Sequence, residues 1–69
     1  MTYETPVFTT NRRLKAAVIL KGIQQRELAK EVGIAEGSLS HIIQGRFEPG
    51  ADLKERLAKF LGVTVEEIF

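Results

Sequence analysis

Residues 25–44 have the sequence QRELAKEVGIAEGSLSHIIQ, in which apolar residues recur at the spacing of two short helices joined by a tight turn. Ala29 is small enough for a second helix to approach closely, and Gly33 can adopt the positive φ that a sharp corner requires. Ile34 is suitably placed to fill the turn. The pattern predicts helices over about residues 25–32 and 36–44. Their shared apolar face consists of Leu28, Val32, Leu39, Ile42 and Ile43.

Helical patterns flank this pair on both sides. One helix is expected to begin at Thr9 or Thr10, whose hydroxyl groups can cap it, and to end at Lys21. Another is expected over about residues 51–61, and Thr64 with Glu67 forms a capping box that begins a short last helix. A glycine follows each of the first four helices: Gly22, Gly33, Gly45 and Gly62. The sequence therefore predicts an all-α fold, a compact five-helix domain over residues 9–69, preceded by an extended arm over residues 1–8.

The composition excludes several classes of protein. The chain has 10 Lys or Arg, 9 Asp or Glu, one His and no Cys, and its net charge is +1. Without Cys the chain cannot form a disulfide framework, and one His without Cys cannot build a structural zinc shell. We expect no metal and no cofactor. An apolar run of about 20 residues and a signal-peptide pattern are both missing, so we expect no membrane contact and a cytoplasmic location. No paired carboxylates with an accompanying base and no glycine-rich phosphate loop occur, so we expect neither an enzyme nor a small-molecule site.

Three runs of residues carry a resemblance to a known family. They are Leu14 through Lys21-Gly22-Ile23-x-Gln25-x-x-Leu28-Ala29-x-x-Val32-Gly33-Ile34, then Ser38-Leu39-Ser40-x-Ile42-x-x-Gly45-Arg46-x-x-Pro49, and finally Leu57-Ala58-Lys59-x-Leu61-Gly62-Val63 together with the Glu67-Ile68-Phe69 end. Over about residues 10–69 the chain resembles the Xre-type, or phage-repressor, helix-turn-helix family. The resemblance implies a lambda-repressor-like bundle whose third helix enters the major groove of duplex DNA. It also implies a sequence-specific transcriptional regulator, expected to be a repressor associated with the nucleoid.

The helix expected over residues 36–44 has an outer face of small polar residues. At 100° per residue this face contains Gly37, Ser40, His41 and Gln44. A face selected for helix stability alone would carry Lys, Glu and Arg, whereas small polar side chains suit a close approach to base edges. A merely solvated face is the alternative. The resemblance implies base contacts by Glu36, Gly37, Ser38 and His41.

Basic residues concentrate in the first two thirds of the chain. Residues 9–46 carry seven basic and three acidic side chains, and residues 47–69 carry three basic and five acidic ones. Such polarity favours binding to nucleic acid even at a low net charge. Arg12 and Arg13 are phosphate-binding candidates by charge and position, and the resemblance implies the same role for Gln25, Gln44 and Arg46. The full set expected at the DNA backbone is Gln24, Gln25, Arg12, Arg13, Ser40, Gln44 and Arg46.

Two cap positions depart from the family pattern. The family often has Thr or Ser where this chain has Gln24, and Ser where it has Ala35. Ala35 offers no capping oxygen, which costs about 0.5–2 kcal/mol relative to Ser. Glu36 offsets part of this cost through the helix dipole, but a carboxylate repels phosphate and can only accept hydrogen bonds from a base. The base code is therefore sparse, and a protein-interaction module of the same fold, an antitoxin or anti-repressor, is the alternative function.

A sparse code on one helix predicts a homodimer that binds an inverted-repeat operator. Ile19 and Leu20 point away from the predicted buried side of their helix, and the last helix ends in apolar residues. The dimer candidates are Val65, Ile68, Phe69, Ile19 and Leu20. We expect Val7 and Phe8 of the arm to cover the helix over residues 9–21, which leaves the last helix as the favoured contact.

Overall fold

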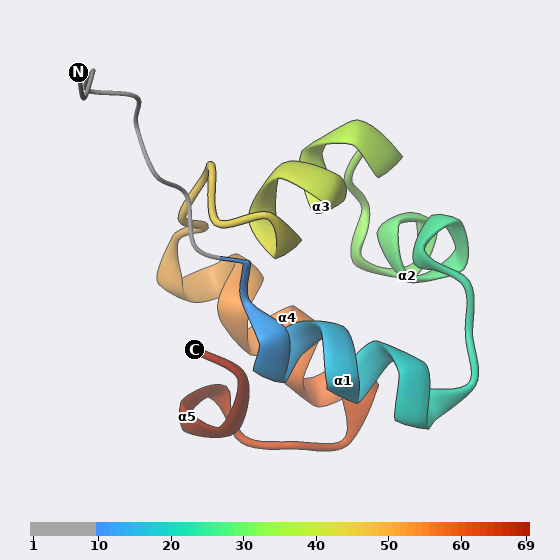
Figure 1. Cartoon of the computed structure of the whole chain (residues 1–69), viewed down its shortest axis with the longest axis vertical. Helices are drawn as coiled ribbons and strands as arrows, with labels where there is room; N and C mark the ends of the chain where they lie inside the picture. Colours follow the sequence, from blue (N-terminus) through green and yellow to red (C-terminus); the bar gives the residue numbers. More distant parts are fainter. Residues whose placement is uncertain (1–9) are drawn as a thin grey trace, which may run out of the picture.

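Five α-helices follow one another in the computed structural model, which describes residues 10–69 (Figure 1). They are α1 (Arg12–Lys21), α2 (Gln25–Val32), α3 (Glu36–Ile43), α4 (Ala51–Leu61) and α5 (Val65–Ile68). No strand occurs among the described residues, and the predicted all-α, five-helix fold is confirmed. The predicted arm over residues 1–8, with its Val7 and Phe8, lies outside the described residues, as does Thr9.

Helix α1 begins later than its pattern predicts, because Asn11 is its N-cap. The Asn11 side-chain Oδ1 accepts a hydrogen bond from the Leu14 N–H at 3.0 Å. Asn is among the preferred N-cap residues because its short side chain reaches the orphan amides of the first turn. The prediction of a cap at Thr10 is therefore wrong. Helices α2 and α4 have their predicted bounds, and α3 ends at Ile43, with Gln44 as its C-cap.

The corner between α2 and α3 is built around Gly33, whose φ of 80° lies in the left-handed region. The Gly33 N–H donates to the Lys30 carbonyl at 3.2 Å, and the Ile34 N–H donates to the Ala29 carbonyl at 3.0 Å. These two bonds satisfy carbonyls in the last turn of α2. Arg56 of α4 adds a third bond, from its Nη1 to the Val32 carbonyl at 3.0 Å. Helix α4 thus holds the end of α2 and, through the short corner, the start of α3.

The core receives one fully buried large side chain from each helix: Leu14, Leu28, Leu39, Leu57 and Ile68. Around them lie Val18, Ala29, Val32, Ile42, Ile43, Ala58 and Leu61. Ile34 packs against this core with part of its surface still exposed, in the place predicted for a residue that fills the turn. No polar or charged side chain is buried in the part of the chain that the structure describes. Apolar burial, at roughly 1.5–3 kcal/mol for each large side chain, therefore holds the helices together.

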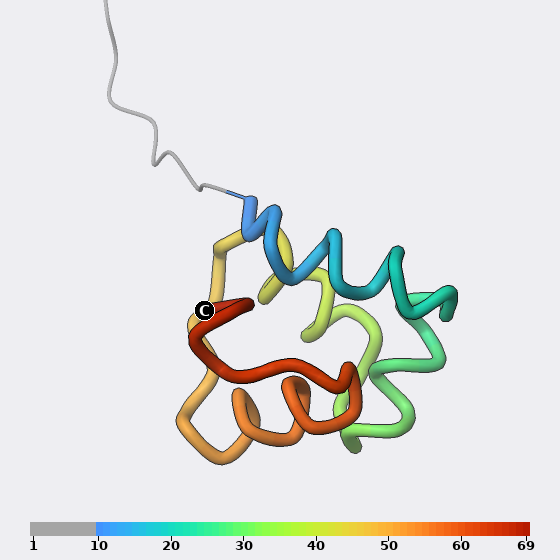
Figure 2. Tube along the Cα trace, turned by 90° about the horizontal axis from the view of Figure 1, so that it is seen from below, coloured from blue at the N-terminus to red at the C-terminus, as the bar shows by residue number. Residues whose placement is uncertain are grey.

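The helices are arranged so that α3 and α5 lie at opposite ends of the folded body (Figure 1). Seen from below, α1 runs along one edge and α4 along the other, with α5 crossing between them (Figure 2). Helix α2 packs on α3 and α4, while α5 packs on α1 and α4. Because α3 turns its apolar residues inward, its polar face looks out of the end opposite α5.

Candidate nucleic-acid interface

Helix α3 presents a polar face to solvent on the side opposite the core. Glu36, Gly37, Ser38 and His41 are exposed, whereas the apolar residues of the same helix are buried. Within residues 10–69, the side chains of Glu36, Ser38 and His41 form no hydrogen bond or ion pair. Gly37 and His41 therefore lie opposite the core, and Glu36 and Ser38 flank them on either side of the exposed face.

Gly37 leaves the backbone of this face bare. A Cβ atom at this position would meet no atom within 4 Å, so packing inside the chain does not require glycine here. Glycine within a helix costs about 0.5–1 kcal/mol relative to alanine. The fold therefore carries this cost without any gain in its own contacts, on the face where a close partner would lie.

The start of α3 has no side-chain cap, as the sequence predicts. Ala35 is the N-cap residue, with an extended backbone at φ −71° and ψ 148°, and no side-chain hydrogen bond reaches the first turn. Glu36 is the acidic residue of that turn. The first amides of α3 therefore depend on solvent or on a bound group, and Glu36 compensates only through its charge.

The other end of α3 meets the start of α1. The Asn11 N–H donates to the Ile43 carbonyl at 2.7 Å, which joins the last turn of α3 to the residue before α1. Because Arg12 follows Asn11, it lies near the C-terminal end of α3. Arg46 follows the same end of α3 in the sequence. A surface groove of about 440 Å³ runs through this region, and Arg12, Arg13 and Gly45 are among its lining residues. The start of α1, with Arg12, thus lies beside the C-terminal end of α3.

Two of the predicted backbone contacts are linked on the surface of α3. The Gln44 Nε2 donates to the Ser40 Oγ at 3.0 Å, so these side chains hold each other one helical turn apart. After Gln44 the chain turns through Gly45, and the Arg46 N–H donates to the His41 carbonyl at 2.9 Å. Arg46 is thereby held close to the end of α3, with its side chain exposed.

Arg12 and Arg13 differ in their surroundings, although both are exposed. The Arg13 Nη1 donates to the Glu66 carbonyl at 3.4 Å, so this guanidinium is directed toward α5. Arg12 makes no such contact among the described residues. Of the two, Arg12 is the better placed for an interface centred on α3.

The start of α2 holds the two glutamines that the sequence predicts at the interface. Gln24 is the N-cap residue, and its N–H donates to the Glu27 Oε1 at 3.4 Å. The Gln24 Oε1 accepts a bond from the Arg26 Nη2 at 3.1 Å, which brings a cation to this helix start that the sequence analysis did not select. Gln25, the first residue of α2, is half-buried.

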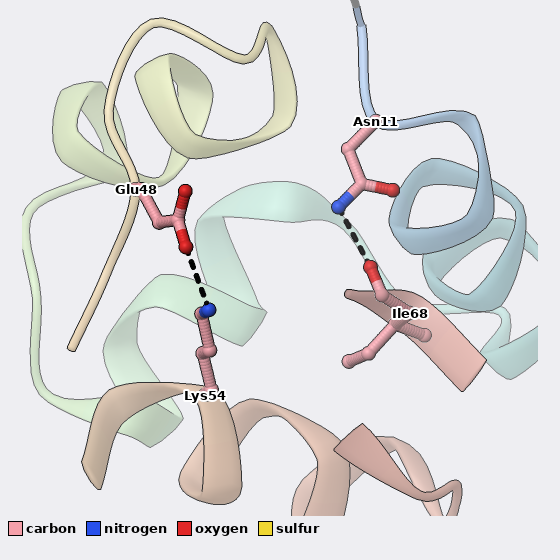
Figure 3. Close-up of polar contacts among 4 residues, drawn as sticks. All are labelled: Asn11, Glu48, Lys54 and Ile68. Atoms are coloured by element: carbon pink, nitrogen blue, oxygen red, sulfur yellow. Dashed lines mark hydrogen bonds and ion pairs between the residues drawn. The ribbon is translucent and has the colours of Figure 1, made fainter. Parts of the chain in front are cut away.

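The loop between α3 and α4 is held by an ion pair that the sequence analysis also missed. The Lys54 Nζ lies 2.9 Å from the Glu48 Oε2 (Figure 3). This hydrogen bond and the charge of Lys54 lower the pKa of the Glu48 carboxyl from its ordinary value of 4.5. The same Nζ lies 5.3 Å from the centre of the Phe69 ring, within the range of a cation–π contact. Glu48 lies six positions before Lys54, whereas Phe69 reaches this lysine because α5 packs on α4.

The predicted dimer candidates fall into two groups. Ile19 and Leu20 have exposed fractions of 67% and 86%, as their position on α1 predicts. Ile68, in contrast, is only 1% exposed, and Val65 and Phe69 pack partly against the core. The expectation that Ile68 offers a surface to a second chain is therefore wrong, because its side chain fills the core of its own chain.

The described residues contain no cluster of three or more His, Asp or Glu side chains that could hold a metal ion. Over the same residues, no helix has the length and apolar character needed to cross a membrane.

Comparison with known proteins agrees with this geometry. A family model described as Helix-turn-helix matches residues 14–68. The chain is also 35% identical, over 57 residues, to an uncharacterized HTH-type transcriptional regulator of Methanocaldococcus jannaschii. That alignment covers 83% of this chain and 86% of the archaeal protein.

Two solved structures of the clp gene regulator ClgR from Corynebacterium glutamicum have the same fold. Both superpose with a TM-score of 0.79 at 29% sequence identity and cover 84% of this chain. The match spans 62% of the ClgR chain in one structure and 74% in the other. The chain therefore spans somewhat less than two thirds of the first ClgR chain.

Proposed function

The chain belongs to the Xre-type helix-turn-helix family, and we propose that it is a transcriptional regulator that binds duplex DNA with α3 in the major groove. The observation that carries this proposal is the arrangement around α3. The exposed Glu36, Ser38 and His41 side chains have no partner within residues 10–69, Arg12 lies beside the C-terminal end of α3, and Arg46 follows that end in the sequence. Polar groups at the centre and cations at the rim suit base edges and phosphates respectively.

Base contacts are assigned to Glu36, Gly37, Ser38 and His41. Glu36 accepts a hydrogen bond from cytosine N4 or adenine N6. The Ser38 hydroxyl can donate a hydrogen bond to a base edge or accept one from it. His41, one turn later, can donate to guanine N7 or O6. Gly37 contributes no side-chain contact, but its bare backbone allows α3 to lie deep in the groove. Specificity then rests on three side chains together with the shape of the DNA.

Contacts with the DNA backbone are assigned to both ends of the helix pair. Gln24 and Gln25 at the start of α2 would contact one strand. Ser40 and Gln44, which are joined by a hydrogen bond, would present their remaining polar groups to the other strand with Arg46. Arg12 would add a contact from the start of α1, and Arg13 would contribute mainly through its charge, because it already bonds the Glu66 carbonyl. These contacts supply affinity and orientation without selecting a sequence.

We propose that the chain represses transcription in the nucleoid, and that it does so as a homodimer bound to an inverted repeat. Three base-contacting side chains per copy supply little discrimination, and a second copy doubles the number of base pairs that are contacted. The recognition helices of such a dimer lie about one turn of DNA, roughly 34 Å, apart.

The experiment that tests DNA binding is a titration of the protein with duplex DNA at several salt concentrations. The logarithm of the affinity should fall linearly with the logarithm of the salt concentration, with a slope of about −0.9 for each phosphate contact. Footprinting on the DNA that flanks its own gene should then reveal a protected inverted repeat. Affinity that does not depend on salt would overturn the proposal and favour a protein-interaction module, a function with which the acidic Glu36 and the low net charge are compatible.

A further inference from the structure

Three apolar residues on the outer surface of α1, namely Ala16, Ile19 and Leu20, have no cover within the described chain. All three are exposed, and Leu20, at 86%, is the most exposed large apolar side chain among residues 10–69. At 100° per residue, Ala16 points between Ile19 and Leu20, so a small residue is flanked by two large ones. Such a surface lets another helix approach closely over Ala16 while the larger side chains enclose it.

A groove lies directly beside this surface, between α1 and the end of the chain. It has a volume of about 340 Å³, and Leu20 forms part of one wall. Ala16, Ala17, Leu61 and Val63 supply further apolar lining. Charged residues line it too: the cations Arg13 and Lys21 from α1, and the acid Glu67 from α5. A projecting apolar side chain and an apolar hollow therefore occupy the same side of the molecule, and charges of both signs border the hollow.

We infer that this surface, which we call the α1–α5 face, binds a second copy of the chain through a two-fold axis, with Leu20 of each copy in the groove of the other. A two-fold contact requires a patch that is complementary to itself, and a projection beside a hollow satisfies that requirement. The rim carries charges of both signs, because Glu67 and Lys21 both line the groove, so each copy can offer an acid and a cation to the other. The Lys21 Nζ lies 5.6 Å from the centre of the Phe60 ring of its own chain. The inference rests on the dimeric mode of DNA binding proposed above. It makes α1 the principal contact, whereas the sequence alone favoured the last helix, α5.

The position of the α1–α5 face is compatible with two copies on one DNA duplex. Helix α1 runs along one edge of the body in Figure 2, and α3 lies at the end opposite α5 in Figure 1. A two-fold axis parallel to the vertical of Figure 1 turns one copy into the other without inverting it. Both α3 helices then look toward the same side.

Sedimentation over a concentration series tests the contact. The wild type should pass from monomer to dimer, and Leu20→Glu should shift this transition at least tenfold toward higher concentration. Phe47→Glu is the matched control, because Phe47 is 55% exposed but lies in the loop after α3 and does not line the groove. A wild type that stays monomeric at every concentration would overturn the inference. Equal weakening by both variants would also overturn it.

Cross-linking provides a second measurement that does not depend on affinity. The chain has no Cys, so Ala16→Cys introduces a single thiol close to the proposed axis. Under oxidising conditions this variant should form a covalent dimer, since two Cα atoms about 4.4–6.8 Å apart can be bridged. Ala51→Cys, exposed at the start of α4, should stay reduced at the same concentration. Equal cross-linking of the two variants would contradict the assignment of the axis.

A binding measurement separates this inference from the proposed function. Leu20→Glu should bind a duplex with a single half-site as the wild type does, with the same salt dependence, and lose at least tenfold in affinity for the inverted repeat. If the wild type dimerises through this face but binds no DNA, the proposed function fails and the contact stands. If Leu20→Glu binds the full repeat with unchanged affinity and stays dimeric, the contact fails and the proposed function stands.

Discussion

The side-chain Nδ2 of Asn11 donates a hydrogen bond of 2.7 Å to the backbone carbonyl of Ile68, although 57 positions separate the two residues (Figure 3). The same side chain caps α1 by accepting from the Leu14 N–H, and the Asn11 N–H bonds the Ile43 carbonyl. One residue thereby joins the start of α1 to the ends of α3 and α5. Because Arg12 follows it directly, the same bonds determine where a predicted phosphate contact lies relative to α3.

Asn11→Ala should lower the free energy of unfolding by about 1–3 kcal/mol, because it removes the cap and leaves the Ile68 carbonyl without its donor. Asn11→Asp should recover the part due to the cap alone, since a carboxylate accepts from the Leu14 N–H but cannot donate to a carbonyl. Urea denaturation measures both. Thr10→Ala is the control and should change stability by less than about 0.5 kcal/mol, because Thr10 is exposed and does not cap α1. A larger loss at Thr10 than at Asn11 would contradict the assigned cap.

Ala35→Ser should raise the free energy of unfolding by about 0.5–2 kcal/mol, because the N-cap residue of α3 has extended backbone angles but no side-chain acceptor. Thermal denaturation followed by circular dichroism measures the change. Lys15→Ser, at an exposed position of α1, should instead lower the melting temperature slightly, since serine is a poorer helix former than lysine. A melting temperature that does not rise in Ala35→Ser would mean that α3 does not begin at Glu36.

Gly37→Ala should raise the stability of the free protein by about 0.5–1 kcal/mol, because the added Cβ meets no atom and alanine favours the helix. The same variant should bind the operator more weakly, since a methyl group on the exposed face separates α3 from the bases. Urea denaturation and a DNA titration on the same sample test both effects. Equal or tighter binding by the more stable variant would show that α3 does not approach the DNA closely at Gly37.

Arg46→Ala should weaken binding to every DNA sequence by a similar factor and reduce the salt slope by about one unit, because a phosphate contact is independent of sequence. His41→Ala and Ser38→Ala should instead change which base pairs are tolerated, at about 1–3 kcal/mol for each lost discrimination. Binding to a library of operator variants separates the two effects. A uniform loss in all three variants would contradict the division between base and phosphate contacts.

The Glu48 carboxyl should titrate below its ordinary pKa of 4.5, and Lys54→Met should return it to that value. Because the pKa is lowered in the folded chain, the Glu48–Lys54 pair stabilises the fold above pH 4.5, and this contribution disappears as the pH falls through the folded-state pKa. Carboxyl chemical shifts in an NMR titration measure the value directly. Lys59→Met, an exposed change elsewhere on α4, should leave the Glu48 titration unchanged. An ordinary pKa in the wild type would show that the ion pair does not persist in solution.

The sequence by itself determined the helix-turn-helix pair and most helix bounds. The relevant signals are local: apolar residues three or four positions apart define a buried face, and a glycine such as Gly33 permits the left-handed turn that ends a helix. The same periodicity shows which residues of α3 look outward and that Ile19 and Leu20 face away from the core. Each of these properties depends on neighbours within about one helical turn, so no knowledge of the rest of the chain is required.

Only the tertiary structure decided which distant groups meet. Asn11 caps α1 where Thr9 or Thr10 was expected, and it does so while its amide bonds the Ile68 carbonyl, a partner that no local pattern identifies. Ile68 is apolar and close to the end of the sequence, which suggested a surface for a second chain, yet the packing of α5 on α1 and α4 buries it. The position of Arg12 beside the end of α3 has the same origin. Local spacing specifies the faces of each helix, whereas contacts between helices depend on how all five faces close around one core.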